Sequence, residues 1–365
     1  MFCVNLQDRD QAKGFSLIEV MVGMTLGLLT ALVIMQVFSV FENQKRTTTA
    51  GSDAQENGLM AIVQLEQDIR NAGTGLADSA ALNCNAIFSY YESGGTTTIP
   101  APGVPSSVMA PVTITDGGAT GSDTITMTRG TEFLGSIPAT ITSTMPQTSS
   151  TLKVNRTTGF NGTNDRCSGC EGDLILVSQG GICTVMQVTN ANAASLTLTF
   201  NNGVNAPYNP PGSFYNTAPG NTWPTFASGA KILNFGSLIS NTYSVDANYS
   251  LQMVDKSAAV TTLVKDIVSL QAQYGISTAA GVQEVTSWVD ATAASGFNTL
   301  DSDKVKRIKA VRITVVARSG KKEAGNVTTS APGGVDISTL PDWQKYRYRV
   351  YTTIIPLRNI IWANV

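Results

Sequence analysis

The chain has 365 residues, enough for one large domain or two, and it contains no histidine. The missing histidine excludes Ser-His-Asp and Cys-His catalysis and histidine-ligated zinc, and it disfavours an enzyme without excluding carboxylate chemistry. Charged residues make up 14 % of the sequence and the net charge is −2. Bulk electrostatics therefore favour neither nucleic acid nor an anionic membrane as a partner.

Residues 15–41 form the chain's long apolar run, and Glu19 is the single charge within it. As a helix this run would be about 40 Å long, which is enough to cross a bilayer core. It is longer than the apolar core of a secretory signal. We therefore expect residues 15–41 to form a transmembrane helix.

Glu19 needs an explanation, because an ionisable group inside a spanning segment is costly and is a functional candidate. If the chain is cut after Gly14, the free amine of Phe15 lies one helical turn from Glu19, near the positive end of the helix dipole. The pair could form within one chain or between the Glu19 of one chain and the Phe15 of its neighbour. The second arrangement would fix the stagger of packed helices.

The stretch KGFSLIEVMVGM, residues 13–24, resembles the class III signal of type IV pilins. The resemblance implies that a prepilin peptidase cuts between Gly14 and Phe15, N-methylates Phe15 and removes residues 1–14 as a leader peptide. It also implies that residues 15–41 enter the filament core and that Glu19 registers one subunit against the next.

The helical pattern continues through the amphipathic segment 42–75, which we expect to pack on a globular domain. Gly73 and Gly75 predict its end near Asn71. Weak helix formers at 47–54 predict a kink or a loosened turn. The apolar stripe of this segment is predicted to consist of Leu59, Ile62, Leu65 and Ile69.

From residue 76 onward, short β-branched segments bounded by Gly or Asn predict strands. The segment 263–276 could instead be a short helix that leads into a strand. The predicted fold is α+β, with a long N-terminal helix packed on a large antiparallel β-rich domain, 76–365, which could divide near 200–230. The predicted strands are 123–129, 173–178, 183–189, 195–200, 236–246, 249–254, 308–319 and 346–357.

Cys3 would leave with the leader, so Cys84, Cys167, Cys170 and Cys183 would remain. An even number favours disulfides formed in an oxidising compartment. The CSGC motif could also be a redox pair or half of a zinc site, but a second close pair is missing, and we expect no metal. Three pairings are open, and short-range closure weakly favours Cys170–Cys183, which leaves Cys84–Cys167.

Two surface features have competing interpretations. The uncharged loop 201–224 carries Tyr208, Phe214, Tyr215 and Trp223, and it is either a contact surface or, as we prefer, an ordered loop whose aromatics cover the domain edge. In KYRYRV, residues 345–350, strand alternation predicts a packed face of tyrosines and valine and a wet face of cations. A positive patch shared with the basic segment 304–312 would suit DNA, but nucleic acid is disfavoured.

Several later segments together resemble the PilW family of minor pilins, and the likeness runs from Gly14 to Trp362. They include GDLILVSQGGICTVMQVTN, ILNFGSLISNTYSVD, LVKDIVSLQAQYG, IKAVRITVVARS and YRYRVYTTIIPLRNIIW. The resemblance implies a low-abundance, non-enzymatic subunit of the type IV pilus, which primes pilus assembly and joins other minor pilins in a tip complex.

The same resemblance implies the partners and the location. The partners would be the other minor pilins, the major pilin, the prepilin peptidase, the inner-membrane assembly platform, the lipid bilayer before assembly and a large tip adhesin. The chain would span the inner membrane once with its domain in the periplasm, then move to the extracellular pilus tip. No cofactor is expected. Alternatives are a minor pseudopilin of a type II secretion system, and a tip adhesin or DNA-contacting subunit.

Overall fold

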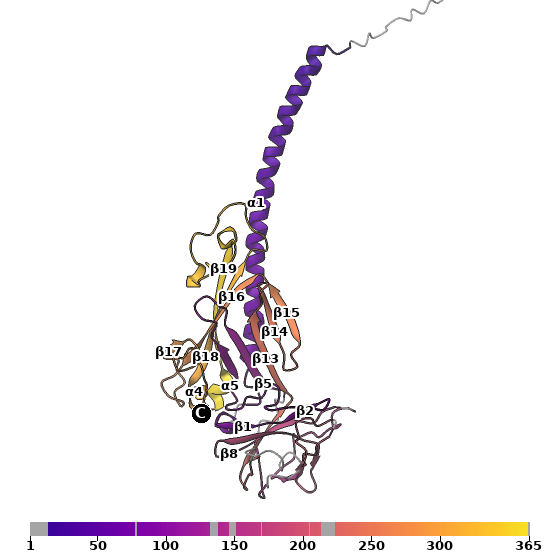
Figure 1. The fold of residues 1–365 in the computed structure, drawn as a ribbon, viewed down its shortest axis with the longest axis vertical. Coiled ribbons are helices and arrows are strands. Elements are labelled where there is room, and N and C mark those ends of the chain that lie inside the picture. Colours follow the sequence, from indigo (N-terminus) through magenta and orange to yellow (C-terminus); the bar gives the residue numbers. More distant parts are fainter. Residues whose placement is uncertain are drawn as a thin grey trace, which may run out of the picture. The chain divides into compact units, whose positions relative to one another are not determined.

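The computed structural model describes residues 14–76, 79–131, 138–145, 151–168, 170–203, 205–212 and 223–363. The chain divides into two compact units, Met1–Ser52 and Asp53–Val365 (Figure 1).

The first unit is the N-terminal part of helix α1, which runs over Leu17–Asn71. The helix begins where the Ser16 carbonyl accepts hydrogen bonds from the backbone N–H groups of Glu19 and Val20, at 2.9 and 3.1 Å. Every residue of 47–54 is α-helical, so the loosened turn predicted there is not observed, and the predicted kink stays a prediction. The Thr48 hydroxyl donates to the Gln44 carbonyl at 3.0 Å, which satisfies the hydroxyl within the helix.

The second unit begins with the remaining turns of α1, whose buried face follows a line of small residues. Ile62, Leu65 and Ile69 are buried as predicted, but Leu59 is 45 % exposed, so its predicted place in the stripe is wrong. Gly58 takes the contact position instead, because a Cβ atom there would overlap the ring of Tyr351. Ala54 and Ala61 are fully buried on the same line.

Two antiparallel sheets receive this part of α1, and we call them together the helix-facing lobe. The five-stranded sheet has the order β15-β14-β13-β5-β4, and the four-stranded sheet has the order β17-β16-β18-β19. Their strands are β4 Val112–Thr115, β5 Thr124–Gly130, β13 Leu238–Val245, β14 Ser250–Val254, β15 Val260–Lys265, β16 Ile267–Ile276, β17 Ser287–Val289, β18 Ile308–Arg318 and β19 Tyr348–Pro356.

The helix predicted within 263–276 is wrong, because β15 and β16 fill this segment and turn at Asp266, whose φ is 59°. Along β16 the burial alternates, with Ala272 and Tyr274 buried and Gln271 and Gln273 half-buried. This two-residue period is that of a strand with one packed face. Four short helices complete the lobe: α4 Ser302–Arg307, η1 Pro332–Gly334, η2 Trp343–Lys345 and α5 Arg358–Ala363.

A second group of elements forms what we call the disulfide lobe. Its five-stranded sheet has the order β1-β9-β8-β12-β6, with β1 parallel to β9, and its three-stranded sheet has the order β10-β11-β7. The elements are α2 Ser79–Leu82, β1 Ala86–Phe88, β2 Tyr91–Ser93, β3 Thr96–Thr98, β6 Ala139–Thr140, β7 Thr151–Lys153, β8 Leu174–Gln179, β9 Ile182–Gln187, β10 Asn190–Asn192, β11 Thr197–Thr199 and β12 Lys231–Gly236.

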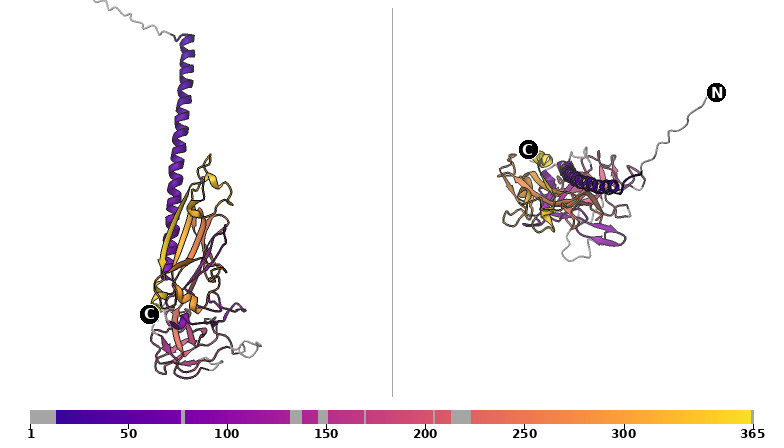
Figure 2. Two further views of the ribbon diagram at one scale, coloured as in Figure 1. Left: turned by 90° about the vertical axis from the view of Figure 1, so that its left-hand side faces the viewer. Right: turned by 90° about the horizontal axis from the view of Figure 1, so that it is seen from above.

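Most of the disulfide lobe is an insertion between two paired strands. The last residue of β5, Gly130, is the register partner of Leu238, the first residue of β13. The chain leaves at Thr131 and returns at Ser237, and the Thr131 N–H donates to the Ser237 carbonyl at 3.0 Å. The two lobes have separate apolar cores, and α1 contributes to the core of the helix-facing lobe. Figure 2 shows the orange and yellow strands of this lobe beside the second half of α1.

Candidate assembly site

The residues around the predicted cut lie at the start of α1 and are accessible. Gly14, Phe15 and Ser16 precede the helix, and the Phe15 side chain is 82 % exposed. Glu19 is in the first helical turn and is also exposed. Among the residues that the structure describes, none forms a hydrogen bond or an ion pair with the Glu19 carboxylate. Its charge is therefore available to a group outside the described part of this chain.

The helix around Glu19 offers an apolar surface with its polar groups satisfied internally. Every large apolar side chain from Phe15 to Phe41 is exposed. The Thr25 hydroxyl donates to the Val22 carbonyl at 2.9 Å, and the Thr30 hydroxyl donates to the Leu26 carbonyl. In the part of the chain that the structure describes, α1 is the one helix long and apolar enough to cross a membrane. Internal satisfaction of these hydroxyls suits an apolar environment.

Polar contacts fix the second half of α1 on the helix-facing lobe. The Tyr243 hydroxyl donates to the Asp68 carboxylate, and burial, reinforced by this contact, raises the pKa of Tyr243. The Tyr351 hydroxyl donates to the Gln55 carbonyl at 3.3 Å. The Asn359 amide donates to the Ala72 carbonyl at 2.8 Å. Sequence reasoning missed these residues, although small residues at Ala54, Gly58 and Ala61 were a readable sign of close approach.

The four cysteines remaining after the predicted cut form two disulfides, but the predicted pairing is wrong. The bonds are Cys84–Cys183 and Cys167–Cys170, with Cα atoms 5.7 and 5.3 Å apart. Strand pairing explains the first bond, because β1 lies parallel to β9 and its Ile87 is the register partner of Cys183. Cys84, just before β1, is thereby brought to β9. Both residues of this bond are fully buried, whereas Cys167 is exposed.

A buried carboxylate anchors the loop that carries the second disulfide. Asp173 accepts hydrogen bonds from the Asn161 N–H and the Asn234 side-chain amide, both at 2.8 Å. An Arg166 guanidinium nitrogen lies 2.8 Å from the other carboxylate oxygen. Burial of a charge is tolerated when it is paired and hydrogen-bonded in this way. The loop 161–172 is thus tied to the sheets of the disulfide lobe at both of its ends.

The positive patch considered from the sequence does not form. Strands β18 and β19 are neighbours, but Ala310 faces Pro356 and Arg318 faces Tyr348. The basic segments 304–312 and 345–350 therefore lie at opposite ends of this strand pair. The Lys309 ammonium is buried, which lowers its pKa, and it donates to the Ala280 carbonyl at 2.8 Å.

The packed face predicted for 345–350 is present. Tyr348 and Val350 pack on a small apolar cluster, and burial raises the pKa of Tyr348 to about 12. Arg349 is exposed, as predicted, and Arg347 pairs with Glu323 at 3.1 Å.

The loop 201–224 is described in part. Tyr208 and Trp223 are 3 % and 5 % exposed and pack inside the disulfide lobe, as expected for aromatics that cover a domain edge. Phe214 and Tyr215 lie outside the described residues.

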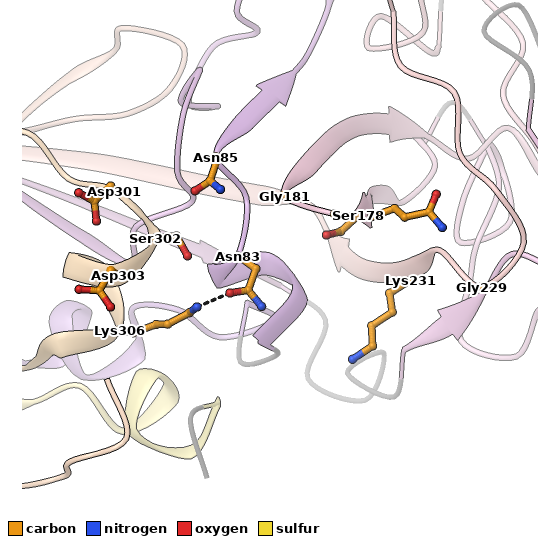
Figure 3. Close-up of a pocket in the computed structure, with 12 residues that line it drawn as sticks. Asn83, Asn85, Ser178, Gly181, Gly229, Lys231, Asp301, Ser302, Asp303 and Lys306 are labelled. Atoms are coloured by element: carbon orange, nitrogen blue, oxygen red, sulfur yellow. Dashed lines mark hydrogen bonds between the residues drawn. The ribbon is translucent and has the colours of Figure 1, made fainter. Parts of the chain in front are cut away.

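A polar groove of about 840 Å³ lies where α4 meets the disulfide lobe (Figure 3). The Lys306 ammonium donates to the Asn83 side-chain carbonyl across it, and the Ser302 hydroxyl donates to the Leu82 carbonyl at 2.6 Å. These contacts join the lobes. Over the described residues, there is no group of three or more His, Cys, Asp and Glu side chains that could hold a metal ion.

Two protein families match the chain, one near its N-terminus and one over its C-terminal part. The family described as Prokaryotic N-terminal methylation motif matches residues 9–35. The family described as Type IV Pilus-assembly protein W matches residues 238–359, which run from β13 into α5. No curated protein matches the sequence.

A solved type IV-like pilin from Thermus thermophilus is 12 % identical to the chain. The match covers 52 % of this chain and 86 % of that one, at a TM-score of 0.20, a superposition too poor to support a conclusion.

The methylation motif followed by a long apolar helix and an antiparallel β domain defines a type IV pilin-like protein. These features are those of a membrane-anchored pilin. The match across β13–β19 narrows this class, because residues 238–359 resemble the PilW domain, which supports a PilW-type minor pilin. The matched families are of structural pilin proteins.

Proposed function

We propose that this chain is a minor pilin that primes assembly of the type IV pilus and forms part of the tip complex with other minor pilins. The observation that carries the proposal is the exposed apolar surface of α1, with the lone carboxylate of Glu19, in a chain that also carries a PilW domain. Such a surface is stable in a bilayer before assembly and against other apolar helices afterwards.

In this proposal the chain first spans the inner membrane with its globular domain in the periplasm, held at the assembly platform. A prepilin peptidase cuts between Gly14 and Phe15 and methylates the new amine. The Glu19 carboxylate of one subunit then pairs with the Phe15 amine of a neighbour. An unpaired carboxylate among apolar helices is costly, so one axial stagger is favoured over the others. A separate motor supplies the energy that draws α1 out of the membrane.

Replacement of the Glu19 carboxylate tests this role in the native host. Glu19→Ala should be inserted and cleaved normally, yet the number of surface pili should fall at least about tenfold, because the favoured stagger loses its ion pair. The matched control is Glu42→Ala, which removes an exposed carboxylate just beyond the apolar run.

Pili are counted by electron microscopy, and mass spectrometry determines the mature N-terminus. Normal piliation of the Glu19 variant would contradict registration, and any start other than Phe15 would contradict the processing step. If the chain were a pseudopilin, its deletion would abolish protein secretion and leave pili intact.

A further inference from the structure

Strand β19 borders the four-stranded sheet, and its outer edge is open. It pairs with β18 over nine residue pairs without a shift in register. In an antiparallel border strand, every second residue directs its N–H and C=O groups away from the neighbouring strand. Within the described ranges, no backbone group bonds to these outward groups of residues 348–356. The segment 323–328 bonds to 344–346, immediately before the strand begins.

The other border strands of the helix-facing lobe are shorter. β17 has three residues, β4 has four and β15 has six, and the neighbour of β15 carries a register shift between Leu251 and Gln252. Short strands, bulges and charges are the usual protection of sheet edges against pairing with another chain. β19 has nine residues and one charge, Arg349, and its Ile354 is 54 % exposed.

We infer that β19 receives an extended strand from a different pilus subunit, which lengthens the four-stranded sheet by one strand. This inference rests on the proposed function, because it assumes that the chain assembles with other subunits. The outward N–H and C=O groups repeat every second residue, about 6.8 Å apart, and an extended backbone presents complementary groups at that spacing. An apolar side chain of the incoming strand would pack beside Ile354.

A second copy of this chain is a poorer occupant for geometric reasons. Two β19 strands would pair antiparallel about a two-fold axis, which points the two domains in opposite directions. The turns of α1 from Asp53 to Asn71 belong to each domain, and in such a pair they would also run in opposite directions. In Figure 1, β19 and β15, the longest of the other border strands, lie on opposite sides of the helix-facing lobe. The lobe can therefore be paired at β19 while β15 stays free, so β15 serves as an internal control.

Hydrogen exchange of the full-length chain tests the inference directly. The chain is purified in detergent alone, and also together with the other minor pilins of its host. Mass spectrometry then follows the amides of 348–356 and of 260–265. We expect the outward amides of β19 to exchange at least about tenfold more slowly in the complex, because they become hydrogen-bonded. The β15 amides should exchange at the same rate in both samples.

A matched pair of variants gives a second readout. Ile354→Lys and Val260→Lys each place one lysine on an open edge, at positions that are 54 % and 61 % exposed. Lysine at a sheet edge opposes pairing, so Ile354→Lys should lower the recovery of the other subunits about tenfold, whereas Val260→Lys should not. Thermal melting of both purified variants shows whether the domain remains folded.

The outcomes separate this inference from the proposed function. A complex that forms while residues 348–356 exchange as in the isolated chain overturns the inference and leaves the proposed function standing. Failure to form any complex with other pilus subunits overturns the proposed function. Protection of β19 in the chain alone, with differently tagged copies recovered together, shows a second copy as the occupant and also overturns the inference.

Discussion

The two lobes of the globular unit are held together in different ways. The helix-facing lobe contains no cysteine and closes its core on α1, through Ala61, Leu65 and Ile69. The disulfide lobe has its own cores, two disulfides and the Asp173 network. The PilW match begins at Leu238, where the insertion ends, and covers the helix-facing strands β13–β19. The residues that match the PilW family therefore belong to the lobe that holds the helix.

The largest effect should come from the disulfide that closes the disulfide lobe. Replacing Cys84 and Cys183 by alanine removes a crosslink with a sequence separation of 99 residues, worth about 4.7 kcal/mol of unfolding free energy in the chain-entropy model. Replacing Cys167 and Cys170 by serine opens a loop with a separation of three, and should cost about 2 kcal/mol or less. Urea unfolding under oxidising conditions measures both losses. Equal losses would show that loop size does not decide the contribution.

The close approach of α1 should give the next effect, this time in the helix-facing lobe. Gly58→Ala should destabilise by about 1–3 kcal/mol, because the added Cβ would overlap the ring of Tyr351. Gly51→Ala is the matched control, since a Cβ atom added at Gly51 would have no atom within 4 Å outside its own helix. The control should be neutral or stabilising by up to about 1 kcal/mol, the helix propensity gained. Thermal melts compare the two, and a stable Gly58→Ala protein would exclude this packing.

The smallest effect concerns α4, beside the junction of the lobes. The Asp301 carboxylate accepts a hydrogen bond from the Lys304 N–H at 2.9 Å, and this bond lowers the pKa of Asp301. Asp301→Ala should cost about 1 kcal/mol at neutral pH.

The pKa of Asp301 is lower in the folded than in the unfolded chain. The carboxylate therefore contributes fully to the free energy of unfolding above about pH 4, and this contribution is lost as the pH falls through the folded-state pKa. Asp301→Asn keeps an acceptor and should remain within a few tenths of a kcal/mol of the native chain. Its acid dependence should be smaller than that of the native chain by the contribution of Asp301 alone, about 1 kcal/mol, and melts from pH 7 to pH 3 measure this. A native acid dependence in the asparagine variant would refute the assignment.

Local patterns in the sequence predicted the local structure well. Apolar periodicity located α1, glycines located its end at Asn71, and all eight predicted strands correspond to observed strands. The failures arise where contacts are non-local. Leu59 fits the helical period, but the small side chain of Gly58 places the contact line elsewhere. Cys84 meets Cys183 only because two distant strands pair in parallel.

The residues of the candidate site also fall into two groups: those that the local sequence predicts, and those that only non-local contacts bring together. Gly14, Phe15 and Glu19 form a contiguous motif that can be read directly, and the structure places all three at an exposed helix start. The groove in Figure 3 brings Asn83 and Lys306 together from segments 223 residues apart. No local spacing predicts such a pair, because it depends on how the two lobes meet. The open edge of β19 likewise follows from strand order and not from composition.

The paired ends of the insertion have a consequence for how such chains can diversify. Gly130 and Leu238 face each other in the β5–β13 ladder, so their Cα atoms are about 5 Å apart, a gap that a two-residue turn also spans. Each doubling of the length of a flexible inserted segment adds only about 0.6 kcal/mol of closure entropy. The segment 131–237 can therefore be lengthened, shortened or exchanged with little strain on the sheet that grips the helix. At the junction of β5 and β13, a different inserted segment could therefore present a different surface while the helix-facing lobe stays the same.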